Sequence, residues 1–134
     1  MPIQAGTQSR LGANSPIGTA TITVGAESGN VINVAIQLND KADNALAARA
    51  SVFAYLSDDA NGDSIAASAP DSGYAIGTDG LIIPVVANKA SVLVSEADGD
   101  IDISITESGA DTWYLILVLP DGTLQASGAI TFAA

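Results

Sequence analysis

Apolar side chains occupy every second position between residues 31 and 39, at Ile32, Val34, Ile36 and Leu38. Successive side chains of a β-strand point to opposite faces of a sheet, so this period of two predicts a strand with one buried and one solvated face. The same alternation returns at Ile101, Ile103 and Ile105. Strands of this kind are typical of antiparallel sheets that enclose a shared core.

Turn signals separate further short apolar runs at the spacing of a β-sandwich, which predicts about seven or eight strands in all. Asn61-Gly62 is the strongest of these signals. Residues 112–119 are apolar at nearly every position and predict a central strand, whereas Pro84 within residues 81–86 predicts an edge strand or a bulge. Residues 124–132 alternate again as a final strand.

Some stretches and side chains are less clearly placed by the pattern. Residues 45–50 (ALAARA) resemble a helix in composition but are too short for a stable one, so we expect them to begin the strand that continues through residues 51–57. Residues 66–80 predict a long connection anchored by Tyr74 and Ile76. Among the aromatic residues on predicted strands, Trp113 and Phe53 are expected in the core. Tyr55 or Tyr114 is a candidate for an interface, where aromatic side chains are enriched.

The first 18 residues (MPIQAGTQSRLGANSPIG) show neither a helical nor a strand period. They fit a disordered leader, or an extended arm that becomes ordered on a neighbouring subunit or partner. Their low charge and apolar side chains favour the arm, and its candidate partner-binding residues are Ile3, Arg10, Leu11 and Ile17. The sandwich domain is then expected to span residues 19–134. No signal peptide is expected, because these residues lack a basic end and an apolar run.

Composition narrows the possible functions. The chain has 134 residues, enough for one ordinary domain. Its formal net charge is -11, and its four basic residues, Arg10, Lys41, Arg49 and Lys89, are scattered. Neither nucleic acid nor an anionic membrane is expected as a partner, because both attract clustered positive charge. The chain contains no cysteine and no histidine, which removes thiol chemistry and the commonest general base.

One short motif bears on metal binding. Asp59, Asn61 and Asp63 stand at the first three ligand positions of a calcium loop. The glycine expected next is Ser64, and the closing glutamate is replaced by Pro70. The motif is therefore a weak calcium candidate, and an Asp/Asn-rich turn is the favoured interpretation, with no cofactor expected.

A second acidic group comprises Glu96, Asp98, Asp100 and Asp102. On a strand, alternate members of this run share a face and repel one another unless they are solvated or paired. A solvated loop is favoured over a cation site or a contact with a basic partner. Serines are abundant, but no histidine or Ser-x-x-Lys spacing activates one, so the chain is not expected to be an enzyme.

Three segments resemble bacterial and phage immunoglobulin-like domains. They are VAIQLNDKADNALAARASVFAYLSDDANGD (34–63), IGTDGLIIPVV (76–86) and ESGADTWYLILVLPDG (107–122). The first resembles a strand–turn–strand region, and the others resemble a TDG strand and the penultimate strand of these domains. The resemblance covers roughly residues 19–132 and implies an all-β, immunoglobulin-like β-sandwich preceded by the N-terminal arm.

The whole chain also resembles the small decoration, or cement, proteins of tailed-bacteriophage capsids. This resemblance implies a homo-oligomer, a trimer rather than a dimer, that binds the major capsid protein on the outer surface of the virion after synthesis in the host cytoplasm. It transfers no individual functional residue. The alternative is a receptor- or carbohydrate-binding immunoglobulin-like module of a phage fibre, a tail or a bacterial surface protein, in which Trp113, Tyr55, Tyr74 and Tyr114 would supply exposed rings.

Overall fold

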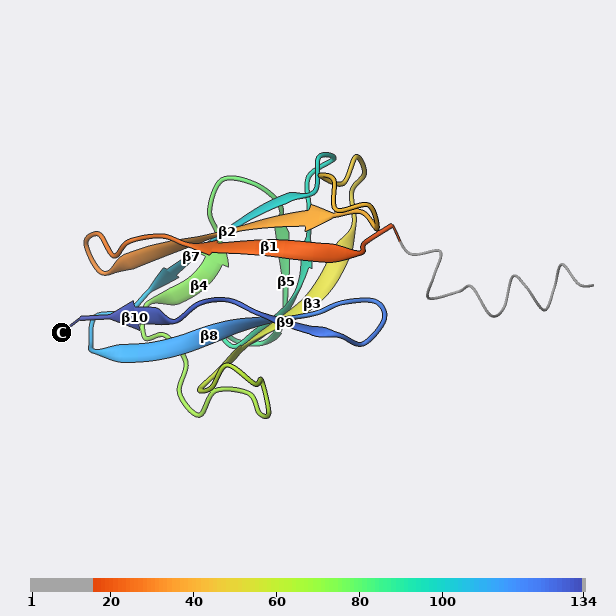
Figure 1. Ribbon diagram of the computed structural model, residues 1–134. Helices are drawn as coiled ribbons and strands as arrows, with labels where there is room; N and C mark the ends of the chain where they lie inside the picture. Colours follow the sequence, from red (N-terminus) through yellow and green to blue (C-terminus); the bar gives the residue numbers. More distant parts are fainter. Residues whose placement is uncertain (1–15, 134) are drawn as a thin grey trace, which may run out of the picture.

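Residues 31–39 form strand β2 (Val31–Asn39), whose alternating aliphatic side chains point into the molecule and are at most 2% exposed. The computed structural model describes residues 16–133, which fold as an all-β, immunoglobulin-like sandwich of two antiparallel sheets (Figure 1). The other strands are β1 (Thr19–Val24), β3 (Ser51–Ser57), β4 (Gly73–Ile76), β5 (Leu81–Val86), β6 (Ala90–Val94), β7 (Asp100–Thr106), β8 (Asp111–Val118), β9 (Leu124–Ala126) and β10 (Ile130–Phe132).

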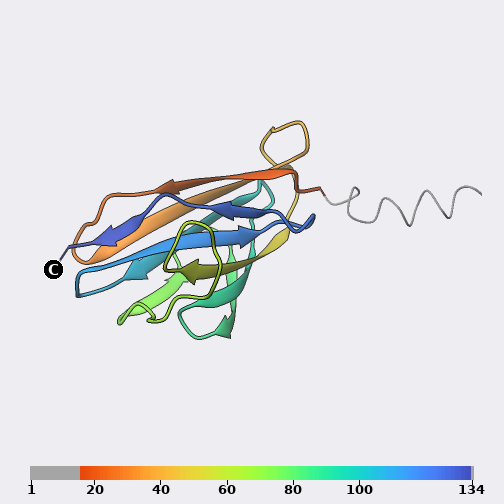
Figure 2. The same cartoon turned by 60° about the horizontal axis from the view of Figure 1, so that its bottom comes forward.

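The order of the strands explains the immunoglobulin likeness. The smaller sheet runs β1-β2-β7-β4, and the larger runs β10-β8-β3-β6-β5 with β9 also paired to β8. With β1 taken as strand A, these orders reproduce the ABED and GFC sheets of a constant-type immunoglobulin domain. The β5–β6 hairpin extends the second sheet beyond β3. Figure 2 shows the same sandwich from a second direction.

The core lies between the layers and is mainly aliphatic. Its largest members are Trp113 and Phe132, whose rings meet edge to face with centroids 6.1 Å apart. Trp113 is fully buried, and its indole N–H donates a hydrogen bond to the carbonyl oxygen of Ser68 at 3.2 Å. The expected core position of Trp113 is thus confirmed, and its one polar group is satisfied.

The expected central and edge strands are both confirmed. Strand β8 has neighbours on both sides, since it pairs with β3 on one side and with β9 and β10 on the other. Strand β5 is at the edge of the larger sheet, and its register with β6 shifts between Pro84 and Val86. A proline has no N–H to donate, so it is tolerated at such an edge.

The structure contains ten strands in the described residues rather than seven or eight. The expected final strand divides into β9 and β10 at Ser127, whose hydroxyl accepts the N–H of Leu115 at 2.9 Å and donates to the carbonyl of Gly128 at 2.7 Å. The side-chain bond to Leu115 takes the place of one backbone bond of this pair, while the Ser127 N–H still bonds the Leu115 carbonyl at 2.8 Å. The connection at residues 66–80 also contains a strand, β4, which includes both expected anchors, Tyr74 and Ile76.

The expectation that residues 45–50 begin the next strand is wrong. Strand β3 begins at Ser51. The N–H of Leu46 instead bonds the carbonyl oxygen of Leu38 at 3.0 Å, and the Leu46 side chain is only 4% exposed. This stretch therefore follows the end of β2 and closes one end of the core.

The sandwich begins before Thr19. Ile17 belongs to the core and is 6% exposed, and the N–H of Gly18 bonds the carbonyl of Asn39 at 2.8 Å. This corrects the expectation that Ile17 contacts a partner, because its own domain covers the side chain. The other candidate arm residues, Ile3, Arg10 and Leu11, lie outside the described residues. Within residues 16–133, no helix is long and apolar enough to cross a membrane.

Candidate functional site: an apolar sheet face and an acidic cluster

The outer face of the larger sheet is apolar across five neighbouring strands. Cross-strand pairing places one row on it, from β9 to β5: Leu124, Val118, Phe53, Val92 and Ile83. The second row consists of Ala126, Ile116, Tyr55, Ala90 and Val86, and Leu81 lies opposite Val94 in a third. These residues are called the apolar face below, and none of them carries a charge.

Alternation along β3 explains why this face exists. Val52, Ala54 and Leu56 point into the core, so Phe53 and Tyr55 point outward. The expectation that Phe53 lies in the core is therefore wrong, and its side chain is 38% exposed. Because the strand is apolar on both faces, either set could have formed the inner one. The rings of Phe53 and Tyr55 lie beside each other with centroids 6.2 Å apart.

The loop after β3 covers part of the apolar face. The hydroxyl of Tyr55 donates to the carbonyl of Gly62 at 2.6 Å, and Ile116 beneath the loop is fully buried. A Cβ on Gly62 would lie 2.8 Å from the Tyr55 hydroxyl, so only glycine permits this approach. Between this loop and the end of β5 lies an open groove of about 310 Å³, whose apolar walls include Phe53, Ile65 and Val86.

The motif at Asp59, Asn61 and Asp63 forms a turn. Asp59 Oδ1 accepts hydrogen bonds from the N–H groups of Asn61 and Gly62, each at 2.9 Å. This carboxylate therefore stabilises the local backbone. Burial, followed by the negative charges of Asp59 and Asp63, raises the pKa of Tyr55 above its ordinary value.

The opposite outer face, on the smaller sheet, is polar and acidic. One cross-strand row on this face consists of Thr21, Gln37 and Asp100. The other consists of Thr23, Ala35 and Asp102. As expected, Asp100 and Asp102 lie on the same face of β7, because alternate residues of a strand point to the same side. Asp79 joins them, because the N–H of Asp102 bonds the Asp79 carbonyl at 2.9 Å.

The carboxylates of Asp79, Asp100 and Asp102 form a cluster with oxygens within 4.8 Å of one another. Burial, and then the charges of Asp102, Asp79 and Asp98, raise the pKa of Asp100 above its ordinary value. Asp102 also accepts a hydrogen bond from the hydroxyl of Thr78. Hard oxygen ligands suit calcium, but that ion usually takes six to eight of them, about twice what three carboxylates with one oxygen each provide. The clear physical effect of this cluster is mutual repulsion.

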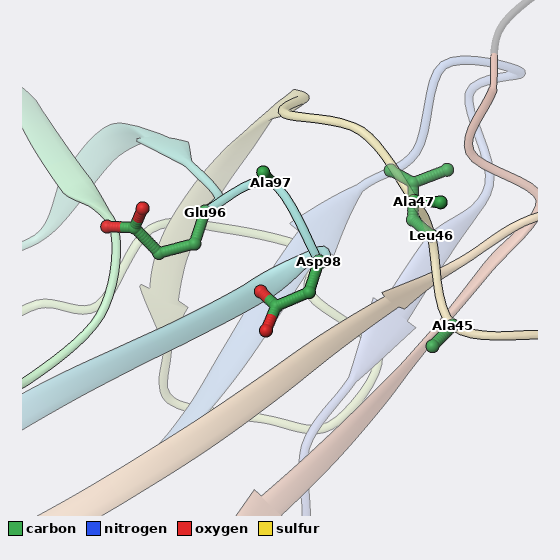
Figure 3. A pocket seen from close by; sticks show the side chains of 6 residues that line it. All are labelled: Ala45, Leu46, Ala47, Glu96, Ala97 and Asp98. Atoms are coloured by element: carbon green, nitrogen blue, oxygen red, sulfur yellow. The ribbon is translucent and has the colours of Figure 1, made fainter.

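Glu96 and Asp98 lie on the turn before β7, where Asp98 Oδ1 accepts a hydrogen bond from the N–H of Asp100 at 3.3 Å. One Glu96 oxygen forms an ion pair with Arg49 at 3.2 Å, and the other accepts the N–H of Gly80 at 3.1 Å. Their turn and residues 45–47 border an open depression of about 590 Å³ (Figure 3). Figure 3 shows Leu46 and two alanines on one side and the carboxylates of Glu96 and Asp98 on the other.

Comparison with known proteins yields a likeness in architecture alone. A cohesin module from a family 33 glycoside hydrolase of Clostridium perfringens ATCC13124 is similar in structure, with a TM-score of 0.45 and 14% sequence identity. The alignment covers 89% of this chain and 98% of the cohesin module. No protein-family model matches the sequence, and the search of curated proteins finds no match.

The sequence reasoning missed the apolar face and the place of Asp79. The signal for the face was present, because residues 51–57 and 112–119 are apolar at both odd and even positions. Asp79 stands more than 20 positions before Asp100, and only the pairing of distant backbone segments brings the two together.

Proposed function

We propose that the chain is a non-catalytic, protein-binding subunit of a larger assembly. The observation that carries this proposal is the apolar face, which an isolated domain would leave in contact with water. Monomeric soluble proteins rarely expose contiguous apolar patches larger than a few hundred Å², and larger ones mark interaction sites. The buried polar side chains of the described residues all have hydrogen-bond partners.

In its finer form, the proposal is that the chain decorates the outer surface of a tailed-phage capsid and binds the major capsid protein. Support comes from the resemblance of the whole chain to the decoration proteins of tailed-phage capsids. The net charge of -11 also suits a face turned away from packaged DNA. Ile3, Arg10 and Leu11 remain the candidates for contact with the shell.

The experiment is to mix the purified full chain with expanded, undecorated capsids whose major capsid protein is encoded beside it. The chain should sediment with these shells and raise the temperature at which they release DNA. A matched control lacks residues 1–15 but retains Ile17, and it should bind more weakly. Failure of the full chain to bind those shells at any tested ratio would overturn the capsid proposal.

The alternative of a carbohydrate- or receptor-binding module has less structural support. In a carbohydrate site of the expected kind, the sugar stacks on exposed aromatic side chains. Trp113, however, is fully buried, and Tyr74 is only 7% exposed. That leaves Tyr55 and Tyr114, both half-buried, together with Phe53. Specific hits on a glycan array that disappear in Tyr114→Ala would favour this alternative over capsid binding.

A further inference from the structure

We infer that the apolar face binds the same face of a second copy and forms a two-fold symmetric homodimer. The inference rests on the proposed function, because it names the partner that covers this face. It concerns the contact between subunits, whereas attachment to a shell is assigned to other residues.

The extent of the exposed apolar surface is the first argument. Five side chains of the apolar face are between 38% and 50% exposed: Leu81, Ile83, Val86, Phe53 and Leu124. Ile65 and Val85, at the rim of the groove, are 41% and 60% exposed. At roughly 80 Å² each, these side chains present on the order of 500 Å² to water, which matches the largest apolar patch of a typical monomer, a kind of patch that is often functional. A sheet face this apolar resembles the inner face of a sandwich.

The distribution of charge opposes self-association but favours one orientation of a second copy, even though the exposed Asp63 lines the groove on the apolar face. Two chains with a net charge of -11 repel each other, and the repulsion is smallest when their acidic surfaces are far apart. Asp79, Asp100 and Asp102 cluster at the smaller sheet, on the other side of the sandwich from the apolar face. In a dimer joined through the apolar faces, the two clusters lie at opposite ends.

The geometry favours packing face to face. Two sheets stack when both contacting faces are apolar, and a second copy supplies an identical face without further requirements. Pairing edge to edge is disfavoured at β5, because Pro84 and the neighbouring register shift interrupt its free backbone groups. A single self-complementary patch on each copy is satisfied in a two-fold symmetric dimer. A cyclic trimer instead needs two different contacting patches on each copy. The inference thus differs from the trimer implied by the resemblance.

The area sets the expected affinity. Burial of about 500 Å² on each copy gives a total of about 1,000 Å², which falls among weak or transient interfaces. We therefore expect a reversible dimer with a dissociation constant on the order of 10 µM. Moderate salt should strengthen it by screening the repulsion between the acidic chains.

Sedimentation of the full chain between roughly 1 and 200 µM, around the expected dissociation constant, tests the inference. The mass should rise from 13.4 kDa toward twice that value. Phe53→Glu and Ile83→Glu each place a charge on the apolar face and should weaken association at least about tenfold. Thr23→Glu adds the same charge on the outer face of the smaller sheet and should leave association unchanged. Trp113 fluorescence shows whether each variant is folded.

Cross-linking supplies a second measurement that tolerates a destabilised variant. The chain contains no cysteine, so a single introduced thiol can pair only with another copy. Phe53→Cys lies on the middle strand of the row and should form disulfide-linked dimers on mild oxidation, whereas Thr23→Cys should not.

A strictly monomeric chain throughout this range would overturn the inference, as would a trimer or equal weakening by Phe53→Glu and Thr23→Glu. Loss of the dimer with retained capsid binding would reject only this inference. A dimer that binds no shell would reject only the capsid proposal.

Discussion

The side-chain hydroxyls of Tyr74 and Ser91 lie 3.0 Å apart inside the sandwich and join its two sheets by a hydrogen bond. Tyr74 belongs to β4 in the smaller sheet, and Ser91 belongs to β6 in the larger one. Ser91 is fully buried, so water cannot replace its partner. The bond therefore contributes to how the layers are aligned, in addition to their apolar packing.

Removal of either hydroxyl should lower the stability of the fold. Tyr74→Phe leaves the Ser91 hydroxyl buried without its partner and should lower the free energy of unfolding by about 1–2 kcal/mol. The double variant Tyr74→Phe/Ser91→Ala should lose less than the sum of the two single variants. Urea denaturation of all four proteins measures this coupling, and strictly additive losses would show that the two hydroxyls do not interact.

Tyr74 also predicts a dependence on alkaline pH. Burial raises the pKa of Tyr74 to about 12, from an ordinary value of 10.0. The unfolded chain therefore releases this proton first, so the stability from the neutral buried phenol is complete below pH 10 and is lost as the pH rises toward 12. Tyr74→Phe should unfold with a flatter dependence on pH over this window. Parallel curves for the two proteins would contradict the assignment.

The acidic cluster predicts a substitution that stabilises the fold. Because burial and neighbouring carboxylates raise the pKa of Asp100, its charged form opposes folding above that pKa. Asp100→Asn should therefore increase stability at pH 7, by about 0.5 kcal/mol after allowance for solvent screening. The gain should shrink as the pH falls toward 3.8, the ordinary pKa of this carboxyl.

Asp121 provides a control of opposite sign. Hydrogen bonds from Thr123 lower the pKa of this exposed carboxyl, so its charged form favours the fold and that contribution is lost as the pH falls below its ordinary range. Asp121→Asn should therefore decrease stability at pH 7. Thermal melts of both variants at pH 7 and pH 3 measure the contrast, and shifts of the same sign at pH 7 would refute the electrostatic explanation.

The turn at Asp59 predicts unequal effects within a motif that resembles a calcium loop. Asp59→Ala removes the acceptor of two backbone N–H groups and should lower stability by about 1 kcal/mol. Asp63→Ala should have little effect, because Asp63 is exposed. Neither calcium nor a chelator should shift the thermal melt. A chelator that destabilises the native chain but not Asp59→Ala would instead establish the metal site.

Ile17 predicts where the domain can be shortened. Ile17→Ala should lower the free energy of unfolding by about 3 kcal/mol, because it leaves a cavity in the core. Deletion of residues 1–15 retains Ile17 and Gly18 and should preserve the melting temperature, whereas deletion of residues 1–18 should lower it. Equal melting temperatures for the two shortened chains would show that Ile17 contributes nothing to the fold.

The β-sandwich could be predicted because its signal is periodic. In β2 only one phase of the alternation is apolar, so the buried face follows directly from the sequence. In β3 both phases are apolar, and the choice between Val52 and Phe53 depends on the register of this strand with β6 and β8. The same ambiguity that misplaced Phe53 concealed the apolar face, which became visible only once the strands were paired.

The misplaced boundaries have local causes. The Ser127 side chain bonds two backbone groups, which a periodicity analysis does not consider, and it divides the final strand. Ile17 lies in a polar segment that offers no period, yet its side chain completes the core. The acidic cluster required Asp79, whose position depends on the pairing of distant segments.

The burial of Trp113 gives the protein an internal optical probe. Trp113 is the single tryptophan of the chain, it has no exposed surface, and its indole N–H is already bonded to the backbone. Its fluorescence should shift to longer wavelengths when the sandwich opens and should barely change when a partner docks on the outside. The emission spectrum can therefore separate variants that lose the fold from variants that lose only a surface contact, in the same cuvette and without a label.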